Sequence, residues 1–80
     1  MAKLWNLLTA RHYQGLTQDE LAARSKVSRT AIANIESGRN NAKPGTAKAL
    51  ADALGYEIWQ LMSDDKNDLR KQVVKSNGFA

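Results

Sequence analysis

Apolar residues recur along most of the chain at intervals of three and four positions, which is the spacing of a helix with one buried face. Glycine and proline interrupt this spacing at Gly15, Gly38, Pro44, Gly45 and Gly55, where helices are expected to begin or end. The strict alternation of apolar and polar residues that is typical of strands is almost absent. The pattern therefore predicts an all-α protein built from short helices.

Five helices are expected between residues 3 and 62. Their expected spans are residues 3–13, 17–24, 29–37, 46–54 and 57–62. The first should carry Leu4, Leu7, Leu8 and Arg11 on one side, with Gly15 capping it in the left-handed conformation. The core should also include the main apolar residues of the other four helices, which are Leu21, Ala22, Ile32, Ile35, Leu50, Leu54, Ile58 and Leu61.

Two of these helices begin at residues that suit a helix start. Thr17 and Glu20 have the spacing of a capping box, in which hydroxyl and carboxylate each accept a hydrogen bond from the other residue's backbone N–H. Ser28 is a good N-cap for the helix that follows it. Residues 37–45 contain no large apolar side chain and are predicted to form a polar loop.

The pattern is weaker toward the C-terminus. Leu69, Val73 and Val74 could form one more helical face or a short strand. We therefore expect a domain of residues 1–62 and a tail of residues 63–80 that is partly ordered or serves dimerisation or a partner. Trp5 lies off the apolar line of the first helix, so either it flanks the core or the tail or a partner covers it.

Composition narrows the class of protein. The chain has 80 residues, enough for one domain, and no cysteine, which excludes disulfides and cysteine-ligated metals. The apolar run near Met1 is too short for a secretory or membrane-spanning segment. His12 is the single histidine, with no suitable carboxylate cluster nearby, so a surface or capping role is expected and no metal or cofactor. These features predict a soluble, cytoplasmic protein.

The net charge of +4 is unevenly distributed. Residues 1–48 carry eight Lys and Arg against three acids, whereas residues 49–80 carry four against five. Within residues 24–43, five cations accompany a single acid, Glu36. A basic stretch of this kind suits a polyanionic partner, although a charged surface that favours solubility gives the same pattern.

Only about three residues, 25–27, join the second and third expected helices. A join this short makes the two helices cross steeply around a small core, which is the geometry of a helix-turn-helix. The second helix of that motif lies in the major groove of DNA. Here it should turn Arg29, Thr30 and Asn34 outward. Arginine pairs with guanine and asparagine with adenine, while threonine offers a hydroxyl and a methyl group.

Four segments, in this order and spacing, resemble the Cro/C1-type (lambda-repressor-like, Xre) helix-turn-helix domain. They are residues 16–22 (LTQDELA), 27–32 (VSRTAI), 35–38 (IESG) and 50–55 (LADALG). The resemblance covers roughly residues 4–62 and implies a compact five-helix domain that binds operator DNA, usually as a dimer. The expected fold is therefore all-α and lambda-repressor-like, with the helix-turn-helix at its second and third helices.

The same resemblance implies roles for individual residues. Arg29, Thr30 and Asn34 match base-reading positions, and Gln18 matches a position that contacts a phosphate and a base. Contacts with the sugar-phosphate backbone are implied for Ser28, Ser37, Arg39, Asn40, Asn41 and Lys43, and we also expect them for Thr17 and Lys26. Arg11 and Glu36 match a pair that forms an internal salt bridge behind the recognition helix.

The sequence departs from the family pattern in three places. Lys26 occupies a turn position usually held by glycine, so it must adopt a left-handed or adjusted conformation at a cost of about 1 kcal/mol. The fourth helix is expected to begin at Thr46, two residues later than is common. Tyr56 and Trp59 are bulkier than usual beside the fifth helix, and with Met62 they are the candidates for a dimer contact.

The predicted function is transcriptional regulation in the form of repression, carried out by a homodimer on an inverted-repeat operator in double-stranded DNA. No small-molecule ligand or membrane partner is expected. The chain lacks the residue sets of hydrolases and phosphate-binding enzymes, so an enzyme is not expected. Two other functions remain open. One is an antitoxin that represses its own operon and binds a toxin through residues 63–80; the other is a protein-interaction module that no longer binds DNA.

Overall fold

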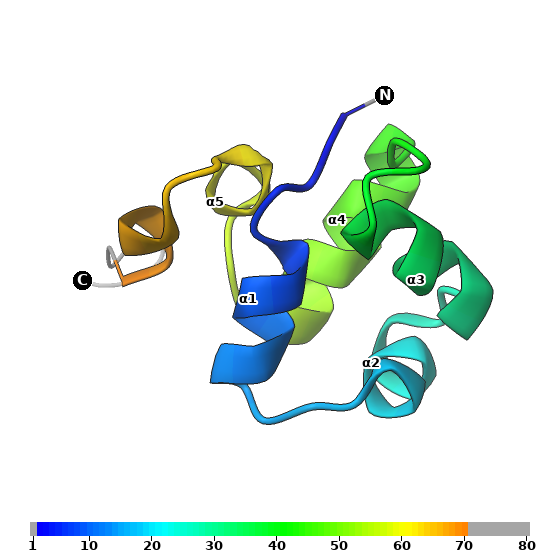
Figure 1. The fold of residues 1–80 in the computed structure, drawn as a ribbon. Coiled ribbons are helices and arrows are strands. Elements are labelled where there is room, and N and C mark those ends of the chain that lie inside the picture. Colours follow the sequence, from blue (N-terminus) through cyan, green and yellow to red (C-terminus); the bar gives the residue numbers. More distant parts are fainter. Residues whose placement is uncertain (1, 71–80) are drawn as a thin grey trace.

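A computed structural model describes residues 2–70 of the chain. Its elements follow in the order α1 (Leu7–Tyr13), α2 (Gln18–Ser25), α3 (Arg29–Glu36), α4 (Pro44–Leu54), α5 (Ile58–Met62) and η1 (Lys66–Arg70), the last a 3₁₀ helix (Figure 1). Within residues 2–70 the only strand-like pairing is an isolated bridge between Ala2 and Ala42. The predicted all-α, five-helix fold is confirmed.

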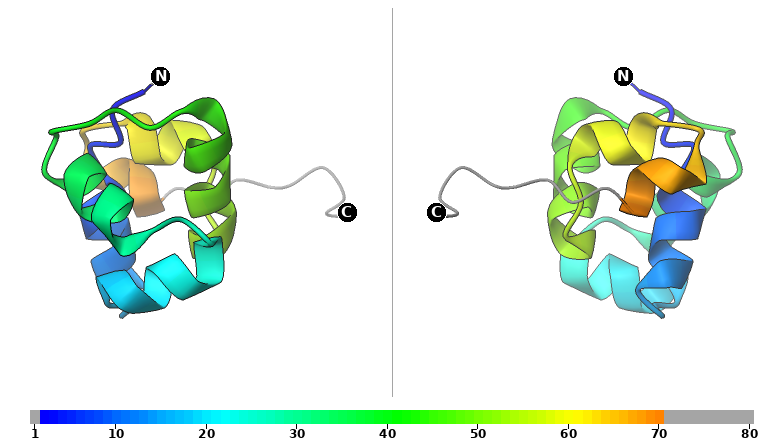
Figure 2. Two further views of the ribbon diagram at one scale, coloured as in Figure 1. Left: turned by 90° about the vertical axis from the view of Figure 1, so that its right-hand side faces the viewer. Right: turned by 90° about the vertical axis from the view of Figure 1, so that its left-hand side faces the viewer.

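The five helices share one small core. Helix α2 packs against α3 and α4, while α1 packs against α3 and α5. Each helix contributes one large apolar side chain that is completely enclosed, and these are Leu7, Leu21, Ile32, Leu50 and Leu61. The left view of Figure 2 shows α2 lying across the bottom of the molecule and α3 crossing it at an angle. Helices α2 and α3, joined by a short connection, therefore cross each other and pack together.

Helix α1 begins at Leu7, four residues later than predicted. The segment before it is held by contacts with distant parts of the chain. Ala2 exchanges two backbone hydrogen bonds with Ala42, at N···O distances of 2.9 and 2.7 Å. The backbone N–H of Asn6 donates to the carbonyl of Leu61 at 3.0 Å. The predicted start was wrong because these long-range pairings, which apolar spacing cannot reveal, hold the segment outside the helix.

Leu8 is exposed, which contradicts its predicted place in the core. Leu7, Ala10 and Arg11 form the buried face of α1, and Leu8 lies about 100° around the helix from Leu7. Its side chain is 39% exposed. Trp5, before the helix, is 59% exposed.

Helix α4 begins at Pro44, two residues before the predicted start at Thr46. Proline suits the first helical position, because its fixed φ is already helical and its missing N–H has no intrahelical partner there. Lys43 precedes it in an extended conformation, with φ −67° and ψ 156°. The prediction of a late start was therefore wrong, and the departure from the family pattern that rested on it does not exist.

Residues 63–70 pack against the helices through buried amides. The side chain of Asn6 donates to the carbonyls of Gln60 (3.1 Å) and Asp65 (2.9 Å), and that of Gln60 donates to the carbonyl of Asp68 (2.9 Å). Leu69 in η1 joins the apolar core. Val73 and Val74, also named from the sequence, lie outside the described residues. No helix within residues 2–70 has the length and apolar character needed to cross a membrane.

Candidate nucleic-acid interface

Both helices of the helix-turn-helix begin at the predicted caps. Thr17 Oγ1 accepts from the N–H of Glu20 at 3.1 Å, and the Glu20 carboxylate accepts from the N–H of Thr17 at 2.8 Å. Hydrogen bonds with the backbone and hydroxyl of Thr17 lower the pKa of Glu20 from its ordinary value of 4.5. Ser28 Oγ accepts from the N–H of Ala31 at 3.1 Å. These caps fix the first residue of each helix and thereby which side chains of α3 face outward.

The turn between α2 and α3 is set by Lys26. Its φ of 62° and ψ of 21° are left-handed, and it is the one non-glycine residue with positive φ among residues 2–70. Its N–H donates to the carbonyl of Ala22 at 2.9 Å. Ser25, buried just before it, donates through Oγ to Leu21 and accepts from the N–H of Val27. The left-handed turn expected from the family pattern is present, and it places an exposed cation at the corner of the motif.

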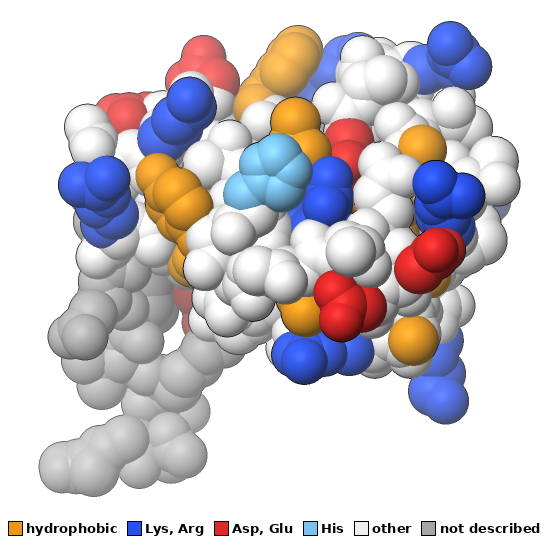
Figure 3. Space-filling model, turned by 60° about the horizontal axis from the view of Figure 1, so that its bottom comes forward, with side chains coloured by type: hydrophobic (Ala, Val, Ile, Leu, Met, Phe, Trp, Pro, Cys, Tyr) orange, Lys and Arg blue, Asp and Glu red, His pale blue; other side chains and the backbone are white. Residues whose placement is uncertain are grey.

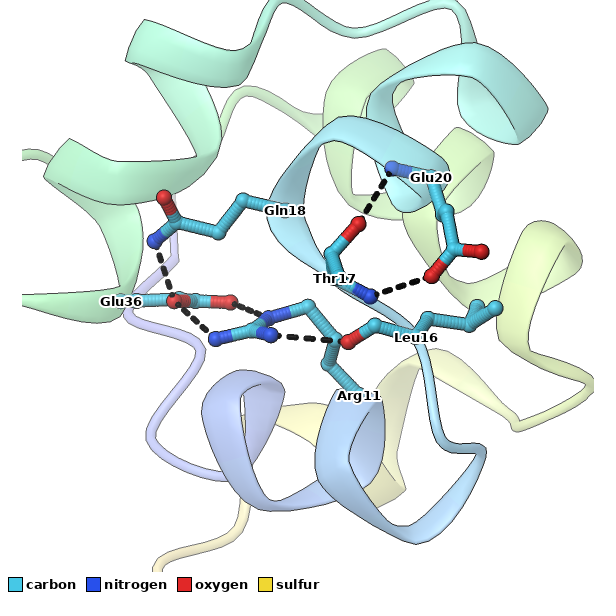
Figure 4. A network of polar contacts seen from close by, with 6 residues as sticks. All are labelled: Arg11, Leu16, Thr17, Gln18, Glu20 and Glu36. Atoms are coloured by element: carbon cyan, nitrogen blue, oxygen red, sulfur yellow. Dashed lines mark hydrogen bonds and ion pairs between the residues drawn. The ribbon is translucent and has the colours of Figure 1, made fainter.

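A buried ion pair joins α1 to the end of α3 (Figure 4). Arg11 Nε lies 2.6 Å from Glu36 Oε2, and Nη2 lies 3.1 Å from Oε1. Arg11 Nη1 also donates to the carbonyl of Leu16 at 2.8 Å. The side chains of Arg11 and Glu36 are 10% and 5% exposed, so water screens their attraction only slightly. This is the pair implied by the family resemblance, and it fixes the back of α3 against α1.

Gln18 takes part in the same network. Its Nε2 donates to Glu36 Oε1 at 2.9 Å, which joins the start of α2 to the end of α3. Its carbonyl oxygen points away from Glu36 (Figure 4). Gln18 was expected to contact DNA, and that role stays a prediction. For Gln18 to contact DNA, either its side-chain oxygen must accept the hydrogen bond or its amide must rotate away from Glu36.

The three predicted base-reading side chains lie on one outward side of α3. Arg29 and Thr30 are exposed and Asn34 is half-buried, whereas Ile32 and Ile35 face the core. Thr30 and Asn34 are four residues apart, so they are neighbours on the helix surface. This side of α3 offers a guanidinium, a hydroxyl and an amide, which are the groups that read base edges in the major groove.

The surface charge around α3 is more positive than the sequence count suggests. All five cations of residues 24–43 are exposed, and these are Arg24, Lys26, Arg29, Arg39 and Lys43. The single acid of this stretch, Glu36, has its carboxylate buried against Arg11. Acidic side chains lie beside basic ones on the face that carries α1 and α2 (Figure 3), and one of them, Asp19 of α2, lies 3.5 Å from Arg29. The stretch still presents more positive than negative charge to solvent, which suits phosphate groups.

An open hollow of about 570 Å³ adjoins the end of α3. Its lining consists of Lys3, Ala31, Ile35, Arg39, Asn40, Asn41, Ala42, Lys43 and Thr46, which includes three cations and no acid. Lys3 Nζ donates to the carbonyl of Gly38 at 2.7 Å. Lys3 was not predicted from the sequence to be part of this surface. No sequence pattern could have found it, because only the pairing of Ala2 with Ala42 brings it beside the loop.

The hydroxyls predicted to contact the DNA backbone already have structural roles. Thr17 and Ser28 cap α2 and α3, as described above, while Ser37 Oγ donates to the carbonyl of Asn34 at 3.1 Å. Their contacts with phosphate stay predictions, as do those of the exposed Asn40 and Asn41. Among residues 2–70, no group of three His, Cys, Asp or Glu side chains could hold a metal ion.

Exposed apolar side chains lie on α5. Trp59 and Met62 are each 45% exposed, whereas Tyr56 is half-buried against the core. Exposed Trp and Met are enriched in protein interfaces. Their part in a dimer stays a prediction.

The comparisons with known proteins agree with this geometry. Residues 10–58 match the family model described as helix-turn-helix, and this range contains all of α2, α3 and α4. The chain is also similar to an uncharacterised HTH-type transcriptional regulator, y4dJ, of Sinorhizobium fredii (strain NBRC 101917 / NGR234). The two are 38% identical over 58 residues, which cover 72% of this chain and 75% of the relative. No solved structure matches the chain significantly. The chain belongs to the Cro/C1-type helix-turn-helix family of DNA-binding transcriptional regulators.

Proposed function

We propose that this protein is a repressor that binds operator DNA with α3 in the major groove and thereby blocks transcription from the overlapping promoter. One observation carries the proposal. The five cations of residues 24–43 are all exposed, while Glu36 is buried against Arg11, so the surface around α3 attracts the DNA backbone.

In the proposed complex, α3 reads bases and the surrounding residues hold phosphates. Arg29 donates two hydrogen bonds to a guanine, and Asn34 pairs with an adenine. Arg39 and Lys43, on the hollow beyond α3, neutralise phosphates of the strand that passes over it. Phosphate contacts supply affinity that falls with salt, and base contacts supply the preference for one sequence.

The proposed binding unit is a two-fold dimer joined through α5. One recognition helix reaches only about four base pairs, which is too few to select an operator from a genome. Trp59 and Met62 offer exposed apolar area for the contact between protomers. In dimers of this motif the two recognition helices lie about 34 Å apart, so the operator should be an inverted repeat with half-sites one helical turn apart.

Selection of bound sequences from a pool of random double-stranded DNA tests the proposal. We expect enrichment of an inverted repeat whose half-site centres lie about 10 base pairs apart, bound by two protein chains. Lys48→Ala is the matched control, because it removes an exposed cation that already pairs with Asp52 on α4. It should select the same repeat. Recovery of unrelated sequences by the unaltered protein would refute the proposal.

A further inference from the structure

Asp19 lies beside the base-reading arginine. Arg29 Nε is 3.5 Å from Asp19 Oδ1, and the two side chains are 64% and 78% exposed. Asp19 belongs to the first turn of α2, and Arg29 is the first residue of α3. A pair this exposed adds little to the stability of the fold. Thr17 and Glu20 already cap α2, so Asp19 is not needed as a cap; its carboxylate interacts favourably with the dipole of α2, and its ion-pair partner is Arg29.

The contact with Asp19 leaves the two terminal nitrogens of the Arg29 guanidinium available for hydrogen bonds with DNA. Asp19 approaches Nε, which is one of five N–H donors in the planar group. The two terminal nitrogens, Nη1 and Nη2, can still present a parallel pair of N–H groups to O6 and N7 of a guanine. A long arginine side chain loses considerable rotamer freedom when it is fixed in one geometry. The Asp19 carboxylate, 3.5 Å away, attracts the guanidinium toward the start of α2, and this bias reduces the loss that occurs on binding DNA.

The charge of Asp19 acts in the opposite direction on the DNA backbone. An exposed carboxylate on the DNA-facing side of α2 repels phosphates, so it weakens binding to every sequence. It also counteracts the attraction of the Arg29 guanidinium to a nearby phosphate, where the arginine would hold DNA without reading it. Both effects raise the ratio of specific to nonspecific binding at some cost in overall affinity.

We propose that Asp19 is a positioning residue that directs Arg29 toward a guanine and so determines specificity at that base pair. The inference rests on the proposed function, since it assigns a role within the same DNA interface. Asp19 does not touch the base. It acts through the guanidinium, and its removal therefore has an effect only while Arg29 is present.

The test compares Asp19→Asn with Asp52→Asn, because both substitutions remove one exposed, ion-paired carboxylate. Dissociation constants are measured on three DNAs: the selected operator, the operator with the Arg29-dependent base pair replaced, and random DNA. Asp19→Asn should bind random DNA about twofold to fivefold more tightly. Its preference for the operator over the replaced operator should fall at least about threefold. Asp52→Asn should leave that preference unchanged, and thermal unfolding verifies that both variants are folded.

The double variant Asp19→Asn/Arg29→Ala separates positioning from direct reading. We expect it to show the same preference as Arg29→Ala alone. An unchanged preference in Asp19→Asn would overturn the inference while leaving the proposed function intact. A further loss in the double variant would also overturn it, because Asp19 would then read a base itself. A failure of the unaltered protein to prefer any sequence would overturn the proposed function and this inference together.

Discussion

Glu36→Gln is the most direct perturbation of the network behind α3. The substitution keeps the shape of the side chain and one oxygen acceptor but removes the negative charge. Arg11 stays charged, because a guanidinium is not deprotonated in proteins. Its side chain, 10% exposed, is then a nearly buried cation without a counter-ion.

The expected cost is large for a domain of this size. Breaking a buried ion pair by removing one partner costs about 3–5 kcal/mol, and the retained amide oxygen favours the lower end, about 3 kcal/mol. For a domain of 60–100 residues each kcal/mol lowers Tm by about 4–8 °C, so Glu36→Gln should lower Tm by about 12–24 °C. Replacing both partners by apolar residues should cost less than the sum of the single changes, because no charge is then stranded.

Urea denaturation followed by far-UV circular dichroism measures this cost. Tryptophan fluorescence is a poor probe, since Trp5 and Trp59 are already 59% and 45% exposed. Asp52→Ala is the matched control, because its ion pair with Lys48 is exposed and should contribute only about 0.5 kcal/mol. A cost below about 1 kcal/mol for Glu36→Gln would show that this carboxylate is not paired and buried as the structure has it.

Three further predictions concern the DNA surface, the dimer and the cap of α2. Arg39→Ala or Lys43→Ala should weaken binding to operator and random DNA alike and reduce the salt slope by about one; a loss confined to the operator would contradict this. Trp59→Ala should weaken binding to the full repeat but not to a single half-site, and equal losses on both would argue against dimerisation through α5. The pKa of Glu20 is lowered in the folded state, so its stabilising effect is present above the unfolded value near 4.5 and is lost as pH falls through the folded value. Glu20→Gln should therefore destabilise the protein at neutral pH and not at a pH well below that value, as urea titrations at the two pH values will show.

Local features of the sequence predicted the motif well. The caps at Thr17 and Ser28 depend on hydrogen bonds between residues three apart, so their spacing in the sequence is sufficient to locate them. The left-handed turn at Lys26 followed from the family pattern rather than from the residue, since lysine itself gives no reason to expect positive φ. Two local features were misjudged: the structure places Pro44 inside the start of α4 and not before it, and it places Leu8 off the buried face of α1.

Long-range contacts were not predictable. Asn6 is buried because its amide meets carbonyls 54 and 59 residues away, and nothing near Asn6 in the sequence indicates those partners. The place of Lys3 beside the loop after α3 depends in the same way on the pairing of Ala2 with Ala42. The contact of Asp19 with Arg29 arises only once the turn at Lys26 has set the crossing of α2 and α3. Lys3 and Asp19 complete the candidate site, and tertiary packing alone brings them to it.

The central claim is that α3 reads bases. The most direct test compares the effect of Arg29→Ala on operator binding with its effect on nonspecific binding. Affinities are measured on the selected operator and on random DNA at one fixed salt concentration. We predict a loss of about 1–3 kcal/mol on the operator, which is about 5-fold to 150-fold, and a clearly smaller loss on random DNA. Equal losses on both DNAs would contradict the account, because Arg29 would then contribute charge and no sequence preference.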